Sequence, residues 1–144
     1  MAPGMVHAYL RGFGIELMSN SDNVVRGGLS ERHVDIPEFM RILQYGDTPV
    51  EPIDPTEVRR GTDLYETPAP DFRLFRIRLS RGFPYRSPRD RAVEVLICVE
   101  GAARLRPEGA QQDIPIVKGD SFLIPAGVPE YGIEGEGMLY MATV

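Results

Sequence analysis

Apolar and polar residues alternate in short runs through the second half of the chain, from Phe72 onward. Such runs, separated by glycine and proline, predict β-strands, because the side chains of a strand point alternately to its two faces. Seven strand segments are expected, at residues 72–80, 92–101, 102–106, 113–117, 121–125, 131–134 and 137–144. Short strands at close spacing are typical of a small antiparallel barrel or sandwich, so the expected fold class is mainly β.

Residues 7–18 also alternate, and they contain a glycine that suits a tight turn. A hairpin that turns at Gly12–Phe13 would use glycine at the first position of a type II′ loop. In that register a polar face and an apolar face are expected, namely His7, Tyr9, Glu16 and Met18 against Ala8, Leu10, Ile15 and Leu17. A turn centred on Phe13 would instead separate His7 from Glu16, and the sequence leaves both registers open.

One short helix is predicted over about residues 35–45. Asp35 can cap it and Glu38 can complete a capping box, with Pro37 in the first turn. Phe39 lies on one face with Ile42 and Leu43, and the helix is expected to end at Gly46. The next stretch, residues 47–70, contains five prolines and shows little periodicity, which predicts a crossing loop or linker between two β units.

Composition and charge narrow the class of protein. The net charge of −5 argues against a nucleic-acid partner, and no apolar run reaches the length of about 20 residues that a membrane helix needs. The N-terminus lacks the basic start and following apolar segment that are typical of a secretion signal, so a cytoplasmic location is expected. Cys98, the single cysteine, lies in an apolar run and is expected to be a buried, reduced thiol.

Residues 7–32, HAYLRGFGIELMSNSDNVVRGGLSER, contain the most informative motif of the chain. This stretch resembles a motif of type I mannose-6-phosphate isomerases, in which His-Ala-Tyr-aliphatic-x-Gly is followed by aliphatic-Glu-x-Met, Ser-Asp-Asn and Arg. The matching positions are His7, Ala8, Tyr9, Leu10, Gly12, Ile15, Glu16, Met18, Ser21, Asp22, Asn23, Arg26 and Gly28. The chain departs from the family at Gly27, where alanine is usual, and at Ser30, Glu31 and Arg32, where the family has Thr-Pro-Lys.

The C-terminal half resembles a cupin. Glu94 and Gly101 are separated by six residues, as at the end of the first cupin motif, and Gly119, Pro125 and Gly127 resemble the second motif. A shift of 123 positions also places the start of the chain on its end, and the identities are Gly4 with Gly127, Gly12 with Gly135, Gly14 with Gly137 and Met18 with Met141. This repeat indicates two related units.

The resemblance implies the second cupin of a bicupin protein. Residues 1–20 are then expected to be the last strands of a truncated N-terminal cupin, carrying the orphaned hairpin. Residues 21–71 would hold the motif loop, the helix and the Pro-rich connection, and residues 72–144 a cupin-like jelly roll. Without its barrel, the hairpin should pair with the second cupin, pair with another chain, or fray.

The same resemblance implies one zinc ion held by glutamine, histidine, glutamate and a later histidine, of which His7 matches the last. Arg26 matches the residue treated as catalytic, Glu16 is a candidate acid–base group or neighbour of the metal, and Arg32 is a candidate contact for the substrate phosphate. The usual His-x-His pair before Glu94 is missing, and His7 and His33 are the only histidines. A histidine-rich metal site within this chain is therefore excluded, and the C-terminal barrel is expected to be structural.

The leading hypothesis is a C-terminal portion of an enzyme that interconverts mannose 6-phosphate and fructose 6-phosphate. Because three of the four ligands would lie upstream, the chain alone is expected to be inactive and not to retain zinc. A stand-alone cupin-like binding or assembly module is the alternative. A third hypothesis is a split enzyme in which a separate polypeptide supplies the N-terminal half.

Overall fold

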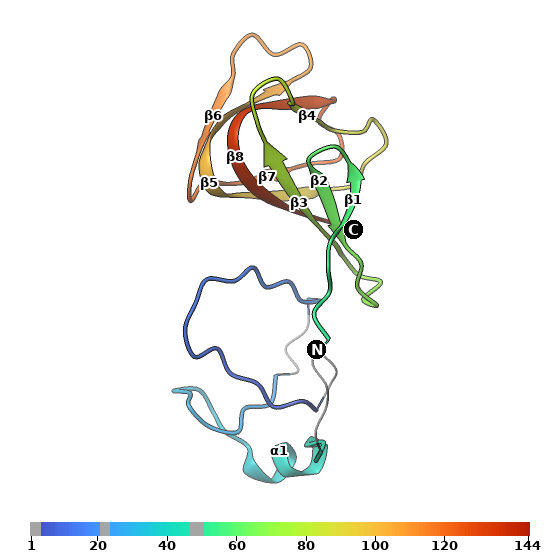
Figure 1. Cartoon of the computed structure of the whole chain (residues 1–144). Helices are drawn as coiled ribbons and strands as arrows, with labels where there is room; N and C mark the ends of the chain where they lie inside the picture. The colour runs from blue at the N-terminus through green and yellow to red at the C-terminus, as the bar shows by residue number, and fades with distance from the viewer. Residues whose placement is uncertain (1–3, 21–23, 47–50) are drawn as a thin grey trace. The chain divides into compact units, whose positions relative to one another are not determined.

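The computed structural model describes residues 4–20, 24–46 and 51–144 of the chain, which divides into two compact units, Met1–Pro52 and Ile53–Val144 (Figure 1). The first unit contains the helix α1 (Ile36–Ile42) and extended loops. The second contains one antiparallel sheet of eight strands. The mainly β fold expected from the sequence is therefore confirmed.

The strands follow one another closely along the second unit. They are β1 (Thr56–Arg59), β2 (Thr62–Tyr65), β3 (Arg73–Leu79), β4 (Tyr85–Arg86), β5 (Glu94–Pro107), β6 (Ile114–Val117), β7 (Ser121–Ile124) and β8 (Tyr131–Thr143). Their order in the sheet is β1-β2-β3-β8-β5-β6, with β4 paired to β8 and β7 paired to β5. The two long strands, β5 and β8, curve strongly, so the sheet bends back on itself (Figure 1).

Strands β5 and β8 form the centre of this fold. They pair along their full lengths, from Glu94 opposite Thr143 to Pro107 opposite Tyr131, with one bulge between Cys98 and Glu100. On its other edge β5 pairs first with β7 and then with β6. Apart from the bulge, β5 is thus paired with β8 along its whole length, and each half of β5 also pairs with a further strand on its other edge.

Side chains on these strands alternate between the two faces of the sheet, and those that point inward form the core. The inward side chains are almost fully buried and belong mainly to β3, β5, β6 and β8; among them are Ile77, Leu96, Cys98, Leu105, Ile116, Ile133, Leu139 and Met141. Burial of such side chains is the main favourable contribution to folding. Cys98 is a free thiol inside this core, as the sequence predicts, and burial raises its pKa.

Two pairs of predicted strands are single strands in the structure. Residues 92–101 and 102–106 fall largely within β5, and residues 131–134 and 137–144 fall largely within β8. The sequence prediction was wrong because it took Gly101, Gly135 and Gly137 for turns. They instead lie within the two paired strands, where the backbones of β5 and β8 approach each other closely: a Cβ at Gly101 would lie 2.1 Å from the Glu136 carbonyl oxygen.

The expected connection at residues 47–70 also contains regular structure. Strands β1 and β2 form a hairpin within it, and β2 pairs with β3. Thr62 and Asp63 are buried, and Gly61 at the turn has a φ of +74° while its carbonyl accepts the Arg78 amide at 2.7 Å. The irregular connection therefore ends before Thr56, although the expected boundary was at residue 71.

Helix α1 has the predicted start and an earlier end. The Asp35 carboxylate accepts the Glu38 amide at 3.0 Å, which satisfies one of the free donors of the first turn. The Glu38 carboxylate does not complete the expected capping box, because it binds the Arg41 guanidinium instead. The helix ends with Leu43 as its C-cap, three residues before Gly46.

Residues 7–18 form no β-strand, so the predicted hairpin is wrong for this described segment of the first unit. Of the facing pairs expected from a turn at Gly12–Phe13, one is present: the Tyr9 hydroxyl donates to the Glu16 carboxylate at 2.9 Å. Leu10 and Phe13 are 94% and 78% exposed to solvent. The segment therefore carries apolar side chains without a packed partner within its own unit.

Candidate functional site

The motif places three polar side chains near one another in the first unit. The His7 ring lies edge-on to the Tyr9 ring, with centroids 6.1 Å apart and planes at 68°, and Tyr9 donates to Glu16. The hydrogen bond to this carboxylate raises the pKa of Tyr9 above its ordinary value. His7 is exposed, with Nδ1 at 3.2 Å from the Met5 carbonyl oxygen. This leaves Nε2 facing away from that contact and able to bind a further group.

The remaining candidate residues follow the motif in separate local turns. Arg26 is a half-buried residue whose guanidinium donates to the Val24 carbonyl at 3.4 Å in an exposed hydrogen bond, and the Arg32 amide donates to the Ser30 hydroxyl at 3.1 Å. Ser21, Asp22 and Asn23 lie outside the described residues. Within the described part of the chain, no hydrogen bond or ion pair joins His7, Arg26 and Arg32 to one another. Their convergence on one substrate stays a prediction.

The donor atoms near His7 do not fit a complete zinc site. Structural and catalytic zinc sites use at least three side chains from histidine, cysteine, aspartate and glutamate. No group of three such side chains is close enough to hold a metal ion among residues 4–20, 24–46 and 51–144. A zinc ion at His7 would therefore need ligands from outside these residues.

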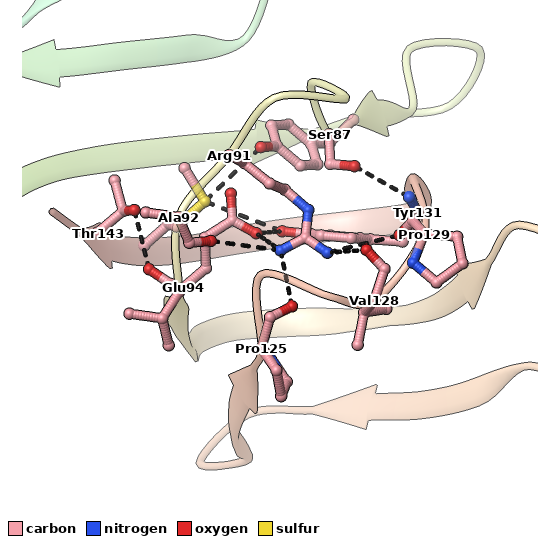
Figure 2. Close-up of polar contacts among 12 residues, drawn as sticks. Ser87, Arg91, Ala92, Glu94, Pro125, Val128, Pro129, Tyr131 and Thr143 are labelled. Atoms are coloured by element: carbon pink, nitrogen blue, oxygen red, sulfur yellow. Dashed lines mark hydrogen bonds and ion pairs between the residues drawn. The ribbon is translucent and has the colours of Figure 1, made fainter.

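The second unit contains a buried polar cluster around Arg91 (Figure 2). The Arg91 guanidinium lies 3.1 Å from the Glu94 carboxylate, and these side chains retain 3% and 2% of their exposure. Tyr131 donates to the same carboxylate oxygen at 2.8 Å, and its ring lies 5.3 Å from the Arg91 guanidinium carbon. The charge of the buried Glu94 carboxylate is thus balanced by one cation, and one hydroxyl adds a hydrogen bond, as buried charges require.

Arg91 also fixes the loop before β8. Its guanidinium donates to the carbonyl oxygens of Pro125 at 3.2 Å and of Val128, so the side chain links β5 to the 125–129 segment (Figure 2). Ser87 adds a second link, because its hydroxyl accepts the Tyr131 amide at 2.9 Å. The carboxylate of Glu94, the glutamate of the cupin motif, is therefore paired with the guanidinium of Arg91. Among the described residues of this barrel, no group of three histidine, cysteine, aspartate or glutamate side chains could hold a metal ion beside it.

Tyr85 packs against Tyr131 and completes the cluster. The ring centroids of Tyr85 and Tyr131 lie 6.0 Å apart, and the Tyr85 hydroxyl contacts the Met141 sulfur at 3.6 Å. Burial raises the pKa of Tyr85 to about 12, and burial also raises the pKa of Tyr131 strongly. Both hydroxyls therefore keep their protons at neutral pH, and Tyr131 acts as a fixed donor to Glu94.

From the sequence, a solvated strand face is the expected arrangement of the arginines at positions 73, 76, 78, 81, 86, 89 and 91. Arg89 and Arg81, with 84% and 91% side-chain exposure, fit this expectation, but it is wrong for Arg91, whose side chain is 3% exposed. Arg91 could have been recognised only by its place three residues before Glu94 of the cupin motif. Spacing alone does not distinguish a buried partner from a surface ion pair.

A second buried ion-pair cluster joins two arginines of β3 to Asp63 of β2. Arg76 and Arg78 donate to the two oxygens of Asp63 at 2.8–3.0 Å, and the Asp63 side chain retains 4% of its exposure. Burial alone would raise the pKa of Asp63, but the hydrogen bonds from Arg78 and Arg76 outweigh it and hold the pKa below its ordinary value. This cluster attaches the hairpin β1–β2 to β3.

We expect Asp63 to make stability depend on pH. Because its pKa is lower in the folded state, its contribution is complete above the ordinary aspartate pKa of about 3.9 and is lost as the pH falls through the lower folded value. Asp63→Asn should therefore unfold more easily at pH 7 and show a flatter decline below pH 5, measured by urea unfolding. The exposed Asp54→Asn is the charge-matched control, and an equal effect of both substitutions would contradict the prediction.

One hollow on the second unit gathers several of the remaining arginines. It has a volume of about 220 Å³, and Arg86, Arg104 and Arg106 line it together with Glu108, Asp113, Glu130 and Glu134. Arg106 is bound through both its Nε and Nη2 to Asp113. Four carboxylates thus outnumber three guanidinium groups, so the charge of this hollow does not favour a phosphate.

Comparisons with known proteins point to one family. A family model described as the cupin domain of mannose-6-phosphate isomerase matches residues 63–144. The mannose-6-phosphate isomerase of Escherichia coli K12 is 35% identical over 134 residues, which are 92% of this chain and 33% of that protein. The Bos taurus enzyme is 30% identical over 125 residues, which are 83% of this chain and 30% of the relative.

A solved structure supports the same relationship. The Salmonella typhimurium mannose 6-phosphate isomerase, bound to its substrate f6p and a zinc atom, has a TM-score of 0.73 and 27% identity, covering 88% of this chain and 32% of that one. The chain thus spans about a third of the length of the E. coli relative and of the Salmonella structure. No helix in the described residues is long and apolar enough to cross a membrane. The match over residues 63–144, together with the motif at His7, shows that this chain belongs to the mannose-6-phosphate isomerase family.

Proposed function

We propose that this chain is the C-terminal portion of a zinc-dependent mannose-6-phosphate isomerase and acts only together with an N-terminal portion. The observation that carries the proposal is the match of 92% of this chain to 33% of the E. coli isomerase. The absence of three clustered donors among the described residues supports the second part, because His7 needs ligands from elsewhere. The proposed substrate is a sugar phosphate, the class bound in the Salmonella structure.

Each candidate residue has a distinct proposed role. His7 would contribute one ligand through Nε2, since Nδ1 is next to the Met5 carbonyl. Arg26 would place a permanent cation beside the oxygen that gains negative charge when a proton moves between adjacent carbons. Glu16 would act on that proton or orient a neighbour, and Arg32 would contact the phosphate, for which a guanidinium fork is well suited.

The first test uses the purified 144-residue chain. We expect no interconversion of mannose 6-phosphate and fructose 6-phosphate and less than one zinc per chain after dialysis, measured by a coupled assay and by metal analysis. Stoichiometric zinc with full activity would overturn the need for a partner. If the chain is instead a non-catalytic cupin module, co-expression with an N-terminal portion will also give no activity.

The second test restores the missing part. Co-expression with the portion of the E. coli isomerase that precedes the matched residues should restore activity. In this complex, Arg26→Met should lower kcat by about 100- to 1,000-fold, the effect of removing a donor to a developing oxyanion. Arg26→Lys should retain more activity, because the positive charge remains. Loss of activity in Arg59→Met, an exposed arginine on β1, would show that the effect is not specific.

A further inference from the structure

A row of uncharged residues crosses the outer face of the sheet in the second unit. Strands β7, β5, β8, β3 and β2 are neighbours there, in this order. Their cross-strand pairs place one residue of each strand in the row, namely Leu123, Val95, Ala142, Leu74 and Tyr65. The next residues on β5 and β8, Leu96 and Met141, are buried in the core. Because side chains alternate along a strand, the row faces away from the core.

The apolar side chains of this row are open to solvent. Leu123 is 67% exposed and Val95, which stands opposite it, is 47% exposed. Val144 lies two residues after Ala142, so alternation places it on the same face, and it is 70% exposed. Single exposed apolar residues are ordinary on a protein surface, whereas a contiguous group of them indicates an interaction site.

A second row of the outer face adds aromatic surface. Ile97 stands opposite Tyr140, and the Tyr140 ring stacks on the ring of Tyr65 with centroids 6.4 Å apart. Tyrosines buried at the centre of an interface contribute strongly to binding. We call the uncharged residues of the two rows the outer patch, which therefore combines branched aliphatic side chains with a fixed pair of aromatic rings.

The other half of the same strands is different. Beyond the bulge of β5, the outward positions of this strand include Arg104 and Arg106, and those of β8 include Glu134 and Glu136, all of them exposed. Outward positions of one strand pair are thus charged in one half and uncharged in the other. A face that met only water would not need this division, so it indicates that the outer patch is covered in an assembly.

The charges beside the outer patch restrict what can cover it. Arg76 and Arg78 both bind Asp63 at 2.8 Å, and Arg78 also binds Glu57 at 3.3 Å, so two cations balance two anions. These paired cations offer little to a nucleic acid or an acidic peptide, which needs unpaired cations. Each chain has a net charge of −5, so two copies repel each other except through a surface that is neutral. The outer patch is such a surface.

We propose that the outer patch binds the outer patch of a second copy of this chain, in a face-to-face dimer with two-fold symmetry. Such an interface uses the same surface on both chains, and a neutral apolar face is complementary to itself. Five strands and about five residues along each give a footprint of roughly 400 Å² per chain. A stable dimer needs about 800 Å² per partner, so the association is weak and reversible. This inference goes beyond the proposed function and does not rest on it.

Sedimentation equilibrium of the purified 144-residue chain tests the proposal. We expect a monomer–dimer equilibrium with a dissociation constant of about 10–1,000 µM, the range of small interfaces. Methyl resonances of Val95 and Leu123 should shift with protein concentration over this range. Those of Val117 should not, because this valine, 52% exposed, lies on β6 opposite Ala102 in the charged half of the face.

Substitutions separate the outer patch from the rest of the surface. Leu123→Asp should weaken the dimer by about tenfold or more, because it places an unpaired carboxylate in the apolar contact of both copies. Val117→Asp is the matched control and should leave the dimer unchanged. Val95→Thr keeps the β-branched shape that suits a strand, so it should weaken the dimer without changing the urea midpoint of the chain. This variant distinguishes loss of contact from loss of folding.

Three results would overturn the proposal. They are a chain that stays monomeric at all concentrations, a dimer that Leu123→Asp leaves intact, and equal weakening by Leu123→Asp and Val117→Asp. If the chain is monomeric but Leu123→Asp disrupts its complex with the N-terminal portion of the E. coli isomerase, that portion covers the patch and the second copy does not. In that case the proposed function stands. If the dimer forms as expected but co-expression restores no activity, the dimer stands and the proposed function fails.

Discussion

Replacing Arg91 by methionine should remove much of the stability of the second unit. The substitution leaves the Glu94 carboxylate buried with only the Tyr131 hydroxyl as partner, and it frees the carbonyls of Pro125 and Val128. Breaking a buried ion pair from one side typically costs about 3–5 kcal/mol. Since a domain of this size has a stability of about 5–15 kcal/mol, we expect a fall in the urea midpoint by a third or more.

Arg89→Met is the matched control for this prediction. Arg89 lies two residues earlier and also pairs with a glutamate, at 2.9 Å from Glu130, but its side chain is 84% exposed. An exposed pair contributes about 0–1 kcal/mol, so Arg89→Met should unfold close to the unmodified chain. Equal losses in both variants would show that burial of the Arg91 pair is not what stabilises the barrel.

A double substitution separates the two contributions of Arg91. Replacing Glu94 by leucine together with Arg91→Met removes the uncompensated carboxylate, and buried ion pairs replaced by apolar groups are often neutral in stability. The carbonyls of Pro125 and Val128 would still lack their donor. We therefore expect the double variant to be more stable than Arg91→Met alone and less stable than the unmodified chain.

The parts of the fold that depend on local chemistry could be predicted from the sequence. The start of α1 follows from Asp35 and its bond to the Glu38 amide, a contact between residues three apart. The inward positions of β5 and β8 follow from alternation, because burial alternates with the same period. The motif at His7 predicted the family, which the match over residues 63–144 confirms.

The parts that depend on distant contacts could not be predicted. Whether Gly101 lies in a turn or within a strand depends on β8, which begins 30 residues later. Arg91 is buried because Glu94 and the 125–129 loop enclose it, and neither contact is visible in the spacing of charges. For residues 7–18 the alternation was recognised correctly, but the pairing that would make a strand needs a neighbour that the first unit does not contain among its described residues.

The same dependence limits the candidate site. His7, Glu16, Arg26 and Arg32 were selected by resemblance, and within the described residues of the first unit only His7 and Glu16 share a neighbour, Tyr9. The polar cluster that the structure does assemble, around Arg91, lies outside the His7 motif, and of its members only Glu94 was singled out from the sequence. Thus the residues proposed for catalysis need a partner to bring them together, whereas the residues of the Arg91 cluster already contact one another and stabilise the barrel.

Replacing Gly101 by alanine should destabilise the second unit by disturbing the pairing of β5 with β8. The residue has a φ of +78°, and an added Cβ would lie 2.1 Å from the Glu136 carbonyl oxygen and 2.6 Å from the Gly137 Cα. These atoms belong to the backbone, so no flexible side chain can move away. The left-handed conformation costs an L-residue about 1–2 kcal/mol, and overpacking adds about 1–3 kcal/mol.

Gly109→Ala isolates the steric part of this effect. Gly109 has nearly the same φ, +76°, but nothing lies within 4 Å of its added Cβ. Both variants therefore bear the conformational cost, and only Gly101→Ala forces β5 and β8 apart. We expect the urea midpoint to fall in both and about twice as far in Gly101→Ala. Similar midpoints would mean that backbone conformation alone, and not the close approach of the two paired strands, requires glycine at position 101.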